Sequence, residues 1–111
     1  MKEIDLKEYM KKAGQMLEKY RSKLDHLQRL RADIESQFFI PEEMVQYFHS
    51  NKSEYYAWQQ IQESIISLED AYNELVGNMM DALNSPEDFK YYLKDGRIPV
   101  LQVIEEEEEE E

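Results

Sequence analysis

The chain has 111 residues, of which 34% are charged, a formal net charge of −12, three glycines, three prolines and no cysteine. This length suits one domain with a modest core. The composition excludes disulfides, thiol catalysis and cysteine-bound metals, and so few turn-forming residues argue against a β-sandwich or β-barrel.

The first predicted element is a long helix over about residues 5–37. Asp5 and Glu8 form a capping-box pattern at its start, and Ile4 and Tyr9 stand at the flanking positions that often pack together. Apolar residues then recur at alternating spacings of four and three, which is the seam pattern of a coiled coil.

A proline follows this helix and begins a short predicted helix at 41–48. A second long helix is expected over about residues 53–84, with apolar residues again at spacings of three and four. The two matching seams predict a long antiparallel, coiled-coil-like hairpin. Arg31 interrupts the first seam, and we expect Glu69 or Asp70 of the second helix to pair with it.

The segment after the second helix begins with a serine, a proline and two acids, which is typical of a helix start. It predicts a short helix at 86–95, ended by Gly96. Residues 97–104 are apolar and rich in β-branched types, and we expect an extended segment that packs on the hairpin or on a partner.

Seven consecutive glutamates at 105–111 repel one another and predict a disordered acidic tail. The predicted fold class is therefore all-α, with residues 1–96 as one helical hairpin domain. Some apolar residues lie beside the seams and outside them, so we expect a homodimer or a bundle completed by a partner; these residues are Leu30, Ile66, Val76, Met80 and Leu83.

The second long helix carries an acidic face. No Lys or Arg occurs between Lys52 and Lys90, and the same segment holds eight Asp and Glu residues. Four of them recur at spacings of four and seven and share one stripe of a helix: Glu63, Asp70, Glu74 and Asp81. They are either a solvated face partly paired with basic residues of the first helix, or an anionic surface that binds a basic partner.

An aromatic cluster surrounds the tip of the predicted hairpin, with seven of the thirteen aromatic residues between positions 38 and 58. The cluster either closes the hairpin as a buried plug or presents a binding face. The candidate partner-binding residues at this tip are Tyr47, Tyr55, Tyr56 and Trp58.

No catalytic motif is present, and His26 and His49 lack the spacing of metal ligands, so we expect no enzyme activity, no catalytic residue, no metal and no cofactor. The predicted function is a non-catalytic protein–protein interaction module, a small accessory protein that binds a basic partner surface. One alternative is a phage or mobile-element inhibitor that acts as an acidic nucleic-acid mimic on a DNA- or RNA-binding defence protein. A second alternative is a purely structural, self-associating helical adaptor.

The expected location is the cytoplasm, because the chain starts without a signal-peptide pattern and contains no cysteine. No run of residues is apolar enough for a membrane span, so we expect no contact with a membrane. The acidic charge of the second half also argues against direct binding of nucleic acid.

Overall fold

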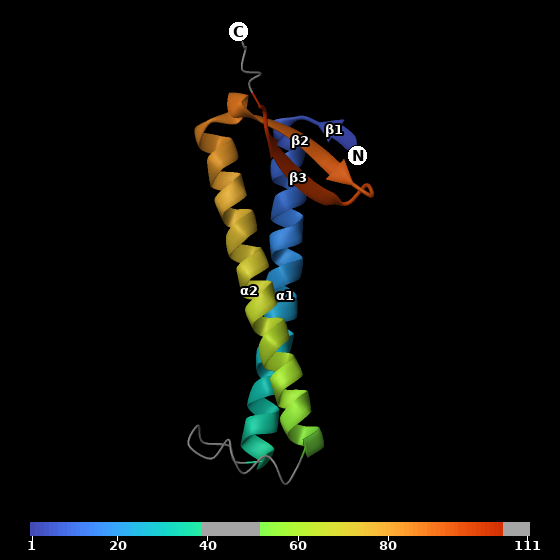
Figure 1. Cartoon of the computed structure of the whole chain (residues 1–111), viewed down its shortest axis with the longest axis vertical. Helices are drawn as coiled ribbons and strands as arrows, with labels where there is room; N and C mark the ends of the chain where they lie inside the picture. Colours follow the sequence, from blue (N-terminus) through green and yellow to red (C-terminus); the bar gives the residue numbers. More distant parts are fainter. Residues whose placement is uncertain (39–51, 106–111) are drawn as a thin grey trace. The chain divides into compact units, whose positions relative to one another are not determined.

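The structure, a computed structural model, describes residues 1–38 and 52–105. Its elements in chain order are β1 (Lys2–Ile4), α1 (Leu6–Phe38), α2 (Lys52–Asn84), the 3-10 helix η2 (Pro86–Asp88), β2 (Phe89–Lys94) and β3 (Ile98–Val103) (Figure 1). The described residues form two compact units. We call residues 1–19 with 73–105 the sheet unit, and residues 20–38 with 52–72 the helix-pair unit.

The prediction of an all-α fold is wrong, because the sheet unit contains a three-stranded antiparallel sheet in the order β1-β2-β3. The helix predicted at 86–95 is only the single turn η2, after which the chain continues as β2. In β2, Tyr91 and Leu93 are buried whereas Lys90 and Lys94 are exposed. This alternation has the period of two that a half-buried strand requires, and it outweighs the helix-start signal before it.

The prediction that Gly96 ends a helix is wrong, because Gly96 lies in the turn between β2 and β3. Lys94 pairs with Ile98, and the backbone N–H of Arg97 donates to the carbonyl of Lys94 at 3.2 Å. Asp95 and Gly96 have φ angles of 56° and 74°. Asp-Gly is a preferred pair where a hairpin turn needs two successive positive φ angles, so the sequence at this point forms a tight hairpin. Residues 98–103 of the predicted extended segment are its second strand, β3.

The opposite edge of the sheet is β1, which pairs with β2 so that Ile4 faces Tyr91 and Lys2 faces Leu93. Asp5 then caps α1, because its Oδ1 accepts a hydrogen bond from the backbone N–H of Glu8 at 2.8 Å. The predicted cap is confirmed, and both long helices are present with boundaries within one residue of the predicted ones.

Aromatic packing forms the core of the sheet unit, which buries Ile4, Tyr9, Tyr91 and Leu93. The rings of Tyr9 and Tyr91 have centroids 5.1 Å apart and are tilted by 43°. The Tyr91 hydroxyl donates to the carbonyl of Pro86 at 3.0 Å, and this bond ties β2 to η2. The Tyr9 hydroxyl is buried and has no hydrogen-bond partner within the part of the chain that the structure describes.

Burial disfavours the charged form of both phenols. Desolvation, with a smaller contribution from Tyr91, raises the pKa of Tyr9 to about 12. Desolvation, followed by the negative charge of Glu87, also raises the pKa of Tyr91 above its usual value. Both tyrosines therefore act as neutral core residues at physiological pH.

The helix-pair unit contains two antiparallel helical segments joined by side-chain hydrogen bonds. Arg31 Nη1 donates to Gln62 Oε1 at 2.6 Å, and Trp58 Nε1 donates to Glu35 Oε2 at 2.9 Å. Moving four residues back along α1, from Glu35 to Arg31, thus corresponds to moving four residues forward along α2, from Trp58 to Gln62. This register places Gln62 opposite Arg31, so the expectation that Glu69 or Asp70 pairs with Arg31 is wrong.

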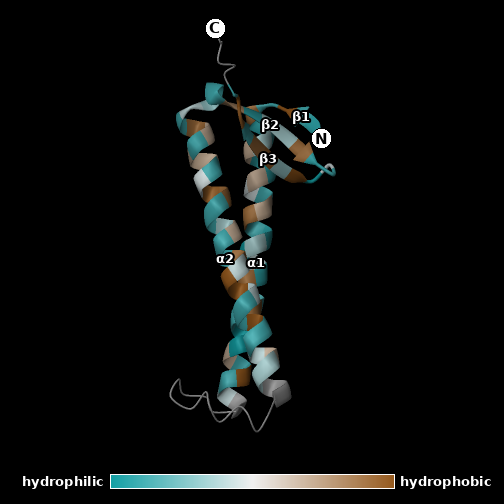
Figure 2. Cartoon of the chain, in the orientation of Figure 1, coloured by the Kyte–Doolittle hydropathy of each residue, from teal (hydrophilic) through white to brown (hydrophobic). Residues whose placement is uncertain are grey.

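Apolar and polar residues alternate along both helices, as the seam pattern predicts (Figure 2). Ala13 of α1 and Ile65, Leu75 and Ala82 of α2 are buried, and the other seam residues from Leu6 to Ile34 and from Trp58 to Met79 are at least half-buried. The short helix predicted at 41–48 lies outside the described residues, as does the predicted disordered tail apart from Glu105.

Candidate functional site

The acidic stripe of α2 begins in the helix-pair unit with Glu63 and Asp70. Both side chains are exposed. Lys23 and Glu63 are among the residues that line a surface hollow of about 500 Å³ between the two helical segments of this unit, with Leu27, Gln60, Ser64, Ser67 and Leu68. The hollow is open to solvent, and Leu27 and Leu68 lie in it beside five polar residues.

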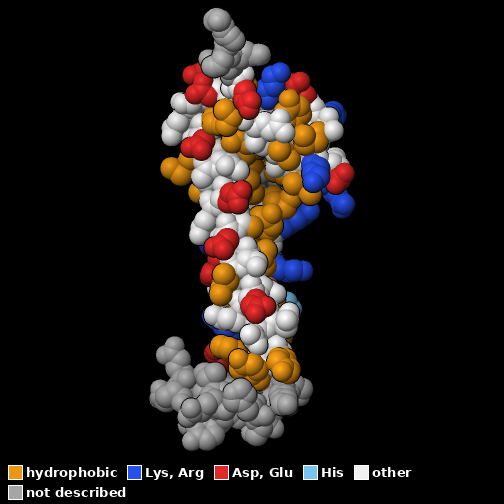
Figure 3. Space-filling model, in the orientation of Figure 1, with side chains coloured by type: hydrophobic (Ala, Val, Ile, Leu, Met, Phe, Trp, Pro, Cys, Tyr) orange, Lys and Arg blue, Asp and Glu red, His pale blue; other side chains and the backbone are white. Residues whose placement is uncertain are grey.

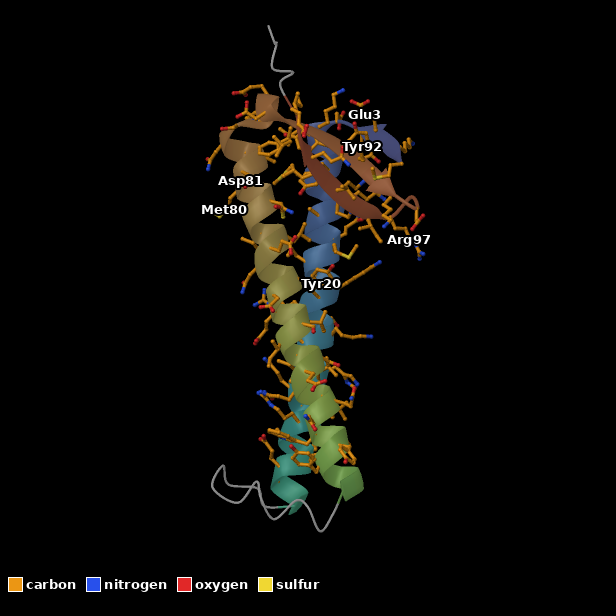
Figure 4. The ribbon with its side chains drawn as sticks, in the orientation of Figure 1. Glu3, Tyr20, Met80, Asp81, Tyr92 and Arg97 are labelled. Atoms are coloured by element: carbon orange, nitrogen blue, oxygen red, sulfur yellow. The ribbon has the colours of Figure 1, made fainter. Side chains whose placement is uncertain are left out.

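The stripe continues in the sheet unit with Glu74 and Asp81, both exposed. Asp81 and its neighbour Met80 project from the same part of α2 (Figure 4). Within the residues that the structure describes, none of the four carboxylates has an ion-pair or hydrogen-bond partner. The expected pairing with basic residues of α1 is therefore not seen for these four acids, and their charges face solvent. Acidic side chains are visible at intervals along α2 (Figure 3).

The described residues of the aromatic tip differ in burial: Tyr55 and Trp58 are half-buried, and Tyr56 is exposed. Trp58 is half-buried on the seam, and its indole N–H is satisfied by Glu35. Tyr55 is half-buried and meets Tyr56 edge to face, with ring centroids 5.8 Å apart. Tyr56 itself is 57% exposed. Trp58 is therefore packed on the seam and the Tyr56 side chain is largely in solvent, while Tyr47 lies outside the described residues.

The apolar residues beside the seams are exposed as predicted at four of five positions. Leu30 and Ile66 of the helix-pair unit are exposed, as are Met80 and Leu83 of the sheet unit, whereas Val76 is half-buried. Each of the two units therefore carries two of the four exposed residues.

The sheet itself was missed by the sequence interpretation, and with it the outer surface of β2 and β3. Tyr92 of β2 lies opposite Glu3 of β1, and Arg97 projects from the hairpin turn (Figure 4). The signal that predicts this hairpin is the Asp-Gly pair at positions 95 and 96 between two short runs rich in aromatic and β-branched residues.

Two further observations bear on chemistry and location. Among residues 1–38 and 52–105, no group of three or more His, Asp or Glu side chains is arranged to hold a metal ion. None of the helices described has an apolar stretch long enough to cross a membrane.

Comparisons of the chain with protein-family models, with curated proteins and with solved structures gave no match.

Proposed function

We propose that this protein is a non-catalytic interaction module that binds a basic surface of a protein partner through the acidic residues of α2. The observation that carries the proposal is that every charged residue of this helix after Lys52 is acidic. No Lys or Arg occurs between Lys52 and Lys90, and the residues of the stripe are exposed and unpaired among the described residues: Glu63, Asp70, Glu74 and Asp81.

The charge of these residues is not needed to form the helix. Glutamine has nearly the same helix propensity as glutamate, and lysine would also relieve the repulsion between like charges. An exposed row of carboxylates instead attracts a basic surface over a distance set by the ionic strength and increases the rate of encounter. We place this interaction in the cytoplasm, a reducing compartment that suits a chain without cysteine.

The test compares neutral variants of each half of the stripe. One variant carries E63Q and D70Q in the helix-pair unit, and the other carries E74Q and D81Q in the sheet unit. A matched control carries D25N and D33N, which neutralise two exposed acids of α1. Each full-length chain is immobilised, partners are captured from a lysate of the encoding organism at low salt, and captured proteins are identified by mass spectrometry.

We expect at least one stripe variant to bind the captured partner about tenfold more weakly or worse, with the control unchanged and all melting curves similar. Binding of the parent should weaken steeply as salt is added. Competition by duplex DNA for the same partner surface would identify a nucleic-acid-binding protein as the partner. If both stripe variants bind as tightly as the parent at low salt, the proposal is wrong and the exposed Tyr56 becomes the better candidate.

A further inference from the structure

β3 forms one edge of the sheet, because the strand order is β1-β2-β3. The backbone N–H of Ile104 donates to the carbonyl of Asp88 at 2.9 Å, so the backbone of Ile104 points toward the β2 side. Backbone direction alternates along an antiparallel ladder. The residues at 98, 100 and 102 therefore bond to β2, and the backbone groups of Pro99, Leu101 and Val103 point to the free side.

The position of Pro99 agrees with this assignment. Proline has no N–H, so within a sheet it is tolerated where that group would face away from the neighbouring strand. The free edge then offers the N–H groups of Leu101 and Val103 and the carbonyls of Pro99, Leu101 and Val103. Within the described residues, no backbone group outside the strands bonds to them.

Proteins commonly protect such edges with short strands, charged residues or proline. β1, the other edge of this sheet, is protected in the first two of these ways, because it has three residues that include Lys2 and Glu3. β3 has six residues without a charge, and it exposes 66% of Val103 and 43% of Ile98. Pro99 protects only its own position on β3, so the edge at Leu101 and Val103 is open to another strand.

We propose that a second copy of this chain pairs with β3 along this edge, antiparallel and centred on Leu101, so that two sheets become one of six strands. In this register the N–H and carbonyl of Leu101 bond to the carbonyl and N–H of the second copy's Leu101. The N–H of Val103 donates to the carbonyl of the second copy's Pro99, and the symmetric bond forms on the other side. Every outward N–H of the edge is satisfied, and the missing N–H of Pro99 is the only gap.

The side chains that this register brings together are complementary. Ile98 and Ile104, which are 43% and 41% exposed, become cross-strand neighbours on one face of the joined sheet. On the other face the exposed Val103 stands opposite the second copy's Pro99, which is already buried within its own chain. Arg97 stands opposite the second copy's Glu105, both exposed, so an opposite-charge pair forms at each end of the junction. These two charge pairs favour a second copy over a strand of unrelated sequence.

The first test uses V103P, because the N–H of Val103 faces the free edge and its loss leaves the bonds between β2 and β3 intact. V103T is the matched control, since it keeps the N–H at the same exposed site. Sedimentation equilibrium between about 1 and 200 μM gives the dimer Kd of each full-length chain. We expect the parent and V103T to dimerise and V103P to do so at least about tenfold more weakly, with similar circular-dichroism spectra.

Two further measurements keep the proposal falsifiable if V103P folds poorly. R97E should weaken the dimer at low salt, and the double variant with R97E and E105R should restore it. In residue-resolved hydrogen exchange, the amides of Leu101 and Val103 should gain protection as concentration rises, while the amide of Gln102 is protected throughout. A parent that stays monomeric at 200 μM, or a dimer with equal Kd for V103P and V103T and no such protection, would overturn the proposal.

Discussion

At the residue scale, Tyr9 and Tyr91 form a natural comparison, because their rings touch in one core but their hydroxyls differ. The Tyr91 hydroxyl donates to Pro86, whereas the Tyr9 hydroxyl is buried without a partner in the described part of the chain. Y91F should therefore lower the free energy of unfolding by about 1 kcal/mol, and Y9F should leave it unchanged or raise it by up to about 1 kcal/mol. Urea denaturation of both variants checks this, and equal destabilisation would contradict it.

The raised pKa of Tyr9 also predicts a dependence of stability on pH. The unfolded chain loses this proton near pH 10.0 and the folded chain near pH 12. Between these values the unfolded state binds fewer protons, so the free energy of unfolding falls as the pH rises. The contribution of neutral Tyr9 to the free energy of unfolding is complete below pH 10.0 and disappears as the pH rises through about 12. Denaturation at several alkaline pH values should show a shallower decline for Y9F than for the parent, and identical slopes would argue against a buried Tyr9.

At the scale of elements, the two long helices could be predicted from the sequence because their signals are local and repeated. Each seam spans many turns, and Asp5 provides a cap that the structure confirms with a 2.8 Å hydrogen bond. In the C-terminal hairpin only β3 lies in a segment predicted to be extended; β2 lies within the helix predicted at 86–95, because Ser85 and Pro86 are a local helix-start signal that masks the alternation in β2. β1 could not be predicted, since a strand of three residues depends on its pairing with β2 far along the chain.

The turn between β2 and β3 allows a second matched prediction with two glycines. Gly96 has a φ angle of 74°, where a Cβ is disfavoured, and Gly77 is an exposed position within α2. A Cβ added at either position meets no atom within 4 Å, so only backbone preferences matter. G96A should lower the free energy of unfolding by about 1 kcal/mol, and G77A should raise it by about 0.5–1 kcal/mol. Thermal or urea unfolding measures the change in the free energy of unfolding for each variant. A stabilising G96A would contradict the turn conformation.

At the scale of the whole molecule, the candidate surfaces differ in how far the sequence predicts them. The exposure of Glu63 and Asp81 follows from their positions off the seam, which the periodicity alone defines. That these acids have no partner among the described residues depends on the register of the facing helix, and the sequence does not specify it. The free edge of β3 depends on the strand order, so it becomes visible only once the sheet is known.

The tail provides the last prediction, because its glutamates carry much of the net charge of the chain. Deleting 106–111 removes six glutamates and changes the formal net charge from −12 to −6. Long-range attraction mainly sets the rate of encounter, so association with a basic partner should slow by about two- to tenfold at low salt, while dissociation changes little. At about 1 M salt, where the Debye length is near 3 Å, the difference should vanish.

Replacing 106–111 by six glutamines keeps the length and should slow association equally. Stopped-flow rates check this, and a faster dissociation in either variant would show instead that the tail makes specific contacts.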